Sequence, residues 1–209
     1  MARMIPSSIE LSNATPSERK VFNLLRSQLR PDVHVFYSVS WQYLDKDGKR
    51  QQSECDFLII DPKYGFLTCE VKGGYKIEVE NNAWKIWDTP FEYHGLVRSP
   101  QLQAEENARY FQNLYKNTYK MNFEGVFGSF VFFPNYNISS PELLDNRPKE
   151  IVLDVNDLDH LCESIDNVFK YYRGKRKIYL NADQNKKMID LVNGRKAISA
   201  VAGELIQYK

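Results

Sequence analysis

The sequence has few cysteines, and their spacing excludes two classes of protein. The three are Cys55, Cys69 and Cys162, an odd number with no Cys-x-x-Cys pair. A disulfide framework needs an even set, and a thiolate zinc site needs closely spaced pairs, so we expect neither. Free thiols fit a reducing compartment, and we expect a cytoplasmic protein.

Long apolar runs and an excess of one charge are also missing. No run approaches the roughly 18 apolar residues that a membrane-spanning helix needs, and residues 1–6 lack the apolar centre of a signal peptide. We therefore expect neither export nor a membrane anchor. The formal net charge is +1, so a site for a polyanion must come from a local patch or a bound metal.

Several motifs that identify enzyme classes are absent. There is no glycine-rich phosphate loop, which argues against an ATPase or helicase, no His-Glu-x-x-His and no internal repeat. The scattered His34, His94 and His160 are interpreted as structural or solvated rather than as metal ligands. What is present, 43% hydrophobic and 26% charged residues in a chain of 209, is typical of one globular domain, with at most a small appendage.

Periodic patterns predict a mixed sheet with helices on its faces, an α/β or α+β fold. Apolar alternation and turn residues predict strands over 33–43, 49–60, 66–72, 76–80, 84–87, 125–134 and 151–155. Capping residues and apolar stripes predict helices over 15–29, 99–116, 156–172 and 181–194. We expect the hairpin over 76–87 to extend the main sheet. Residues 10–135 would form a core, and 136–209 a strand-helix extension packed on it.

The hairpin over 54–72 carries the residues best suited to chemistry. Pro62 and Gly65 predict a turn centred on Lys63, which places Asp56 opposite Glu70 and Glu54 opposite Lys72. One face of the hairpin is interpreted as core, and the ionisable end of the other as the edge of a cleft. Facing carboxylates destabilise a sheet unless something neutralises them, and a divalent cation would do so. Alternatively, Asp56 and Glu70 end two solvated strands, and Glu54 forms a surface ion pair with Lys72.

Other polar residues have two interpretations each. Glu18 is either the carboxylate of a capping box or a third acidic group leaning into the cleft. Arg98, Gln103 and Asn107 could contact a phosphate backbone or form the wet edge of a packing helix. The basic cluster over 173–177, which includes Lys175 and Arg176, is a candidate nucleic-acid contact or a solvated loop. Glu54 could tune the pKa of Lys72 or compete with Asp56 for an ion.

Glu18, Asp56 and Glu70-Val71-Lys72 together resemble the PD-(D/E)xK nuclease superfamily. Within it the chain resembles the nuclease-related domain, NERD, over residues 10–135, including Ser99-Pro100-x-x-Gln103 and a strand that ends in Phe133-Pro134. Cys55 stands where the motif often has proline. The resemblance implies a restriction-endonuclease-like fold and a nuclease that depends on Mg²⁺ or Mn²⁺.

On this hypothesis each site residue has a role in hydrolysing phosphodiester bonds. Asp56, Glu70 and the Val71 carbonyl would hold the metal, joined by Glu18 directly or through water. Lys72 would orient or help deprotonate the attacking water, and Gln103 would steady the substrate. The partner would be nucleic acid, with DNA favoured over RNA. The alternative function is a catalytically inactive nucleic-acid-binding or assembly module with the same fold.

Two C-terminal segments, 180–184 and 197–203, resemble the region before the ATP-binding loop of superfamily-one helicases. The loop itself is missing. Either the chain is a fragment or relative of a nuclease-helicase, or the likeness is due to chance. A helicase and a second copy of the chain are therefore candidate partners.

Overall fold

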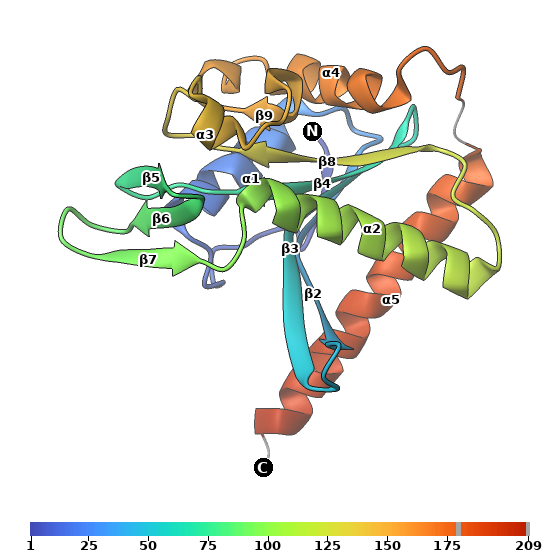
Figure 1. The fold of residues 1–209 in the computed structure, drawn as a ribbon. Helices are drawn as coiled ribbons and strands as arrows, with labels where there is room; N and C mark the ends of the chain where they lie inside the picture. Colours follow the sequence, from blue (N-terminus) through green and yellow to red (C-terminus); the bar gives the residue numbers. More distant parts are fainter. Residues whose placement is uncertain (179–180, 208–209) are drawn as a thin grey trace.

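A six-stranded mixed sheet forms the centre of the molecule (Figure 1). The computed structural model describes residues 1–178 and 181–207, with only the backbone given for 196–207. The strand order is β1-β2-β3-β4-β8-β9. The strands are β1 (Arg3–Ile5), β2 (His34–Leu44), β3 (Arg50–Asp61), β4 (Gly65–Val71), β8 (Val126–Phe132) and β9 (Val152–Leu153). The predicted antiparallel meander β2-β3-β4 is confirmed, and β8 runs parallel to β4.

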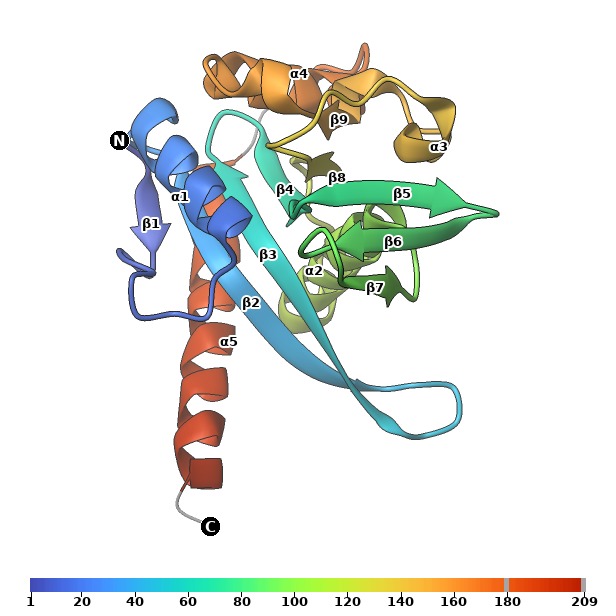
Figure 2. The same cartoon turned by 90° about the vertical axis from the view of Figure 1, so that its left-hand side faces the viewer.

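Helices cover both faces of this sheet, which confirms the predicted α/β class (Figure 2). On one face lie α1 (Pro16–Gln28) and α4 (Leu161–Arg173), and on the other α2 (Pro100–Tyr119) and α5 (Ala182–Gln207). Apolar residues at helical spacing, such as Phe22 and Leu25 in α1 and Phe111 and Tyr115 in α2, are buried against the strands.

Both faces of the β3–β4 hairpin belong to the core near its turn, including the face whose far end was predicted to line a cleft. Phe57 and Leu67 pack toward α1 and α4. Leu58, Ile60 and Phe66 pack toward α2 and α5. Only the far end of the hairpin, beyond the apolar rows, is left for polar chemistry.

The hairpin over 76–87 does not extend the main sheet, which corrects that prediction. It forms β5 (Lys76–Glu80) and β6 (Ala83–Trp87), and with β7 (Tyr93–Leu96) it makes a separate antiparallel sheet. Its turn is as predicted, with Asn81 and Asn82 at positive φ. Buried Trp84 stacks on Phe133 at 6.3 Å between ring centroids, and this contact fixes the small sheet against the end of β8.

The C-terminal part also differs from expectation. The strand predicted over 151–155 is reduced to β9, between 3₁₀ turns at Lys149–Ile151 and Val155–Asp157 that follow the short helix α3 (Pro141–Leu144). The helix predicted to end near Gly194 continues as α5 to Gln207. The helicase-like segments are not tested, because Leu180 and the side chains of 197–203 lie outside the described residues.

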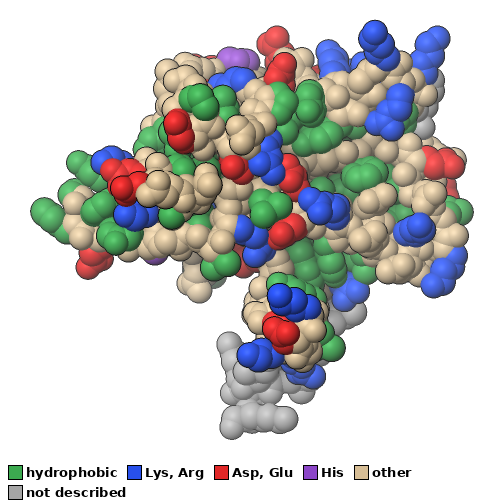
Figure 3. Space-filling model, viewed as in Figure 1, with side chains coloured by type: hydrophobic (Ala, Val, Ile, Leu, Met, Phe, Trp, Pro, Cys, Tyr) green, Lys and Arg blue, Asp and Glu red, His purple; other side chains and the backbone are tan. Residues whose placement is uncertain are grey.

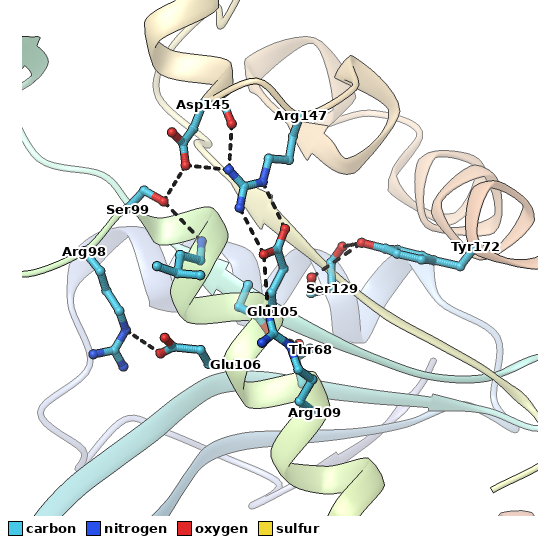
Figure 4. A network of polar contacts seen from close by, with 12 residues as sticks. Thr68, Arg98, Ser99, Glu105, Glu106, Arg109, Ser129, Asp145, Arg147 and Tyr172 are labelled. Atoms are coloured by element: carbon cyan, nitrogen blue, oxygen red, sulfur yellow. Dashed lines mark hydrogen bonds and ion pairs between the residues drawn. The ribbon is translucent and has the colours of Figure 1, made fainter. Parts of the chain in front are cut away.

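A polar network fixes the N-terminal half of α2 to the layer that follows β8 (Figure 4). Arg147 donates to both carboxylate oxygens of Glu105, at 2.9 and 3.0 Å, and to Asp145 at 2.8 Å. Asp145 in turn accepts from Ser99, the N-cap of α2. From within the sheet, Thr68 donates to the Ala104 carbonyl at 2.7 Å. These bonds set the position of α2 over β4.

Acidic and basic side chains are interspersed over the face seen in Figure 3, in keeping with the low net charge. Lysines and arginines gather beyond the end of α4, where Lys175 and Arg176 are exposed. Within the described part of the chain, no helix is both long and apolar enough to span a membrane.

Candidate active site

The hairpin register brings Asp56 and Glu70 together at the end of the β3–β4 ladder. Phe57 pairs with Cys69 in that ladder, so the next position toward the open end is shared by Asp56 and Glu70. Their carboxyl groups lie close enough for each to affect the pKa of the other. Asp56 is 9% exposed and Glu70 is fully buried. Two carboxyl groups therefore share one nearly dry position.

Burial makes the charged forms of this pair costly. Burial raises the pKa of Asp56 to about 6, with Glu18 adding to the effect and Lys72 opposing it. Burial first, and then the charge of Asp56, raises the pKa of Glu70 well above its ordinary value. Burial therefore disfavours the charged forms of both groups, and a bound cation would favour them.

Glu70 has one oxygen that is bound and one that is not. Asn107 of α2 donates to its Oε1 at 3.0 Å, whereas Oε2 has no hydrogen-bond partner among the described residues. Asn107 also donates to the Glu54 carbonyl at 3.2 Å and is 1% exposed. It therefore lies in the interior and not on the wet flank of the helix where the sequence placed it.

Lys72 and the backbone of Val71 complete the immediate surroundings of the pair. The ammonium of Lys72 lies 3.8 Å from Glu70 Oε2, and its side chain is 20% exposed. The Val71 amide donates to Asp56 Oδ2 at 2.9 Å. Because the N–H and C=O of one strand residue point the same way, the Val71 carbonyl is also directed toward Asp56.

Glu18 carries out the capping role and also faces the site. Its side chain accepts from the Thr15 amide at 2.7 Å while the Thr15 hydroxyl accepts from the Glu18 amide, a complete capping box. The Tyr37 hydroxyl donates to Glu18 Oε2 at 3.3 Å. Sequence patterns gave no role to Tyr37, since its alternation indicated only a strand residue. Both interpretations of Glu18 are therefore compatible with its position.

A cleft of about 530 Å³ opens beside these residues. Its walls come from the start of α1, the end of β4 and the small sheet, and its lining includes Glu18, Asp56, Val71, Lys72, Ile86, Asp88, His94 and Asn135. Gly73 also lines the cleft, and a Cβ there would meet the Ser17 hydroxyl at 1.7 Å. A glycine at this position therefore allows α1 to pack closely against the end of β4.

The structure does not bring every predicted residue to this cleft. Gln103 is half-buried on α2, one turn before Asn107. Arg98 pairs with Glu106 at 2.7 Å. Glu54 is exposed, lies opposite Ser40 in the β2–β3 ladder and accepts from Ser38. The paired part of the β3–β4 ladder ends before Glu54 and Lys72, and the ammonium of Lys72 lies near Glu70.

Lys175 and Arg176 lie at the other end of the sheet. They follow α4, whose Arg173 lies over the ring of Tyr64 in the β3–β4 turn, 5.9 Å from the ring centroid. The site is at the opposite end of β4, about 23 Å away at 3.3 Å per residue. One nucleic-acid strand would have to cross the length of the sheet to contact both.

The donors at the site fit a small divalent cation. Carboxylate and carbonyl oxygens are the ligands that Mg²⁺ prefers, and it usually takes one or two carboxylates and retains several waters. The Oε2 of Glu70, which has no hydrogen-bond partner among the described residues, supports this fit. Among the described side chains, no three His, Cys, Asp or Glu residues group as a metal site, so Asp56 and Glu70 form a pair and Glu18 stands outside it.

Fold and site together define a mixed α/β domain with an acidic pair and a lysine at the end of one hairpin. The family model of the nuclease-related domain, NERD, matches residues 14–134. The chain belongs to this family, which confirms the resemblance and indicates a nuclease-related function. No curated protein and no solved structure gives a significant match.

Proposed function

We propose that the protein is a nuclease that hydrolyses phosphodiester bonds with Mg²⁺ or Mn²⁺, DNA being favoured over RNA as substrate. The observation that carries this proposal is the buried Glu70 beside Asp56, since Asp56 lines a cleft that Lys72 also lines. A buried pair of like charges lowers the stability of the fold, and a role in binding a cation would account for its presence.

Asp56, Glu70 and the Val71 carbonyl are the proposed metal ligands. A bound divalent cation would supply a water of lowered pKa and neutralise charge on the phosphate. Asn107 positions Glu70 by holding Oε1, which leaves Oε2 directed to the ligand. Glu18 would act through a water, because its Oε2 already accepts from Thr15 and Tyr37.

Lys72 is the proposed group that acts on the attacking water and on the charge of the transition state. Its ammonium lines the cleft and lies near the acidic pair, where it can donate hydrogen bonds to a ligand. Gln103 remains the proposed contact that steadies the substrate. Arg98, Lys175 and Arg176 would bind the nucleic-acid backbone at a greater distance from the cleft. Arg98 would give up its ion pair with Glu106 to bind a phosphate.

Cleavage assays with Mg²⁺ or Mn²⁺ test the proposal. We expect Glu70→Ala and Lys72→Ala each to reduce cleavage by about 10²-fold or more, because each removes a group that acts on the reacting phosphate or water. Lys63→Ala is the matched control, since Lys63 lies in the turn of the same hairpin, at its other end. Cleavage by both site variants at the wild-type rate would contradict the assignment.

One observation favours the alternative, a catalytically inactive nucleic-acid-binding or assembly module. Among the described side chains, two carboxylates without a third form a small ligand set for a metal. If they bind a metal only weakly, the domain would keep its fold but lack nuclease activity. Calorimetric titration with Mn²⁺ separates the two functions. A nuclease should show binding that depends on Asp56 and Glu70, and an inactive module should show none.

A further inference from the structure

A second titratable pair lines the same cleft from the small sheet. His94 lies in β7, and Asp88 directly follows β6. The His94 Nδ1 is 2.7 Å from Asp88 Oδ2, and both residues line the cleft that holds Asp56, Glu18 and Lys72. The sequence alone led to His94 being interpreted as a structural or solvated residue.

The small sheet directs His94 toward the cleft. In the β6–β7 ladder His94 lies opposite Ile86, which is 4% exposed, so the two share the inward face. The neighbouring pair, Trp87 and Tyr93, occupies the outward face. The loop that carries Asp88 is held by its own amide, which donates to the Glu92 carbonyl at 2.9 Å.

This pairing leaves one ring nitrogen of His94 available for a ligand. A carboxylate that accepts from Nδ1–H fixes the orientation of the ring, and in a protonated ring Nε2 is also a donor. The other charged groups that face the cleft are Glu18, Asp56 and Lys72. Among the described residues of the lining, Lys72 is thus the only permanent cation, and a protonated His94 would add a second from another element.

We propose that His94, oriented by Asp88, binds a phosphate oxygen of the nucleic-acid strand that enters the cleft. The inference rests on the proposed nuclease function and extends it. The strand is held between Lys72, at the end of β4, and His94, on β7. The ligand class is a phosphodiester backbone narrow enough to enter a cleft of about 530 Å³, which favours single-stranded nucleic acid over a duplex.

The test measures binding without metal, so that no cleavage occurs. Fluorescence anisotropy with a short labelled single-stranded DNA compares wild type with His94→Gln. We expect the variant to bind about tenfold more weakly near pH 6, because it loses a charge-assisted hydrogen bond. The difference should shrink as the pH rises, because only a protonated ring has a donor at both nitrogens.

Comparing the affinity of His94→Gln with that of wild type at the same pH cancels the contribution of the Asp56–Glu70 pair to binding. The pKa of Asp56 is about 6, so its charge changes over the same range in both proteins. Asp88→Asn should weaken binding near pH 6, because His94 would lose the carboxylate that orients its ring. The same substitution added to His94→Gln should have no further effect, whereas a merely structural role of Asp88 would weaken binding in both backgrounds.

His160→Gln is the matched control. His160 is 52% exposed, like His94 at 53%, and its Nε2 lies 3.9 Å from Asp157, but it is outside the cleft. We expect it to bind as wild type does. Equal affinity of His94→Gln and wild type at every pH would overturn the inference, and the Glu70→Ala cleavage assay would report on the nuclease function independently.

Discussion

At the scale of single residues, the buried pair of Asp56 and Glu70 lowers the stability of the fold, and we attribute its presence to function. Glu70 is fully buried, has an oxygen without a hydrogen-bond partner and lies against Asp56. A core built for stability alone would place a neutral side chain here. Asn107 and Lys72 reduce the cost without removing it, since burial still raises the pKa of both carboxyl groups.

Glu70→Gln should therefore stabilise the metal-free protein. The amide carries no charge and can donate to Asp56, so we expect a gain of about 1–3 kcal/mol at neutral pH. The gain should shrink toward pH 4, because carboxyl groups whose folded-state pKa is raised stabilise the fold at low pH and lose that contribution as pH rises through the folded-state pKa. Denaturant unfolding at several pH values measures this.

The control for this prediction is Asp47→Asn, at the exposed tip of the β2–β3 hairpin. Its free energy of unfolding should follow that of wild type across the pH range. If Glu70→Gln were less stable than wild type at neutral pH, the buried charge would be satisfied in some other way, and the argument for a cation would fail.

Asn107→Ala should weaken metal binding without removing a ligand. Asn107 fixes Glu70 from α2, and loss of such a support typically costs about 10- to 100-fold in metal affinity. Calorimetric titration with Mn²⁺ measures the change. Unaltered affinity would show that Glu70 is held well enough by the strand alone.

At the scale of elements, α2 is the part that links the polar network to the site. Its N-terminal half is bound to Asp145 and Arg147 through Ser99 and Glu105 (Figure 4). Two residues beyond Glu105, Asn107 donates to Glu70. The network therefore sets the position of Asn107, the residue that supports the acidic pair from α2.

Arg147→Ala should destabilise the protein by about 2 kcal/mol, because it leaves the partly buried Glu105 without its bidentate partner. Arg109→Ala is the matched control on the same glutamate. Arg109 is 64% exposed and 3.8 Å from Glu105, so its loss should cost under about 0.5 kcal/mol. Equal effects of the two substitutions in thermal unfolding would contradict this account.

At the scale of the whole molecule, the core extends past the part that matches the family. The match ends at residue 134, but α4 covers one face of the sheet with Leu161, Val168 and Phe169. On the other face, Met188 and Val192 of α5 are buried against β2 and β3. The family domain alone, with α1 and α2, would leave part of each face uncovered.

A chain shortened to residues 1–135 should accordingly fail to reach the native fold. Removal of α4 and α5 exposes two large apolar surfaces, which favours aggregation over folding. Gel filtration and far-ultraviolet circular dichroism compare it with the full chain. A monomeric, cooperatively unfolding product would show that the C-terminal segment is an appendage that the core does not need.

The sequence by itself determined the local structure and the acidic pair. Turn residues, caps and alternation depend on neighbours along the chain, so the hairpin register of Asp56 and Glu70, the capping box at Thr15 and the buried strand before Pro134 could all be predicted. Only the tertiary structure decided that the hairpin over 76–87 forms its own sheet and that Asn107 is buried. It also decided that His94 shares a cleft with Lys72. These arrangements depend on contacts between residues far apart in the chain, which local patterns do not specify.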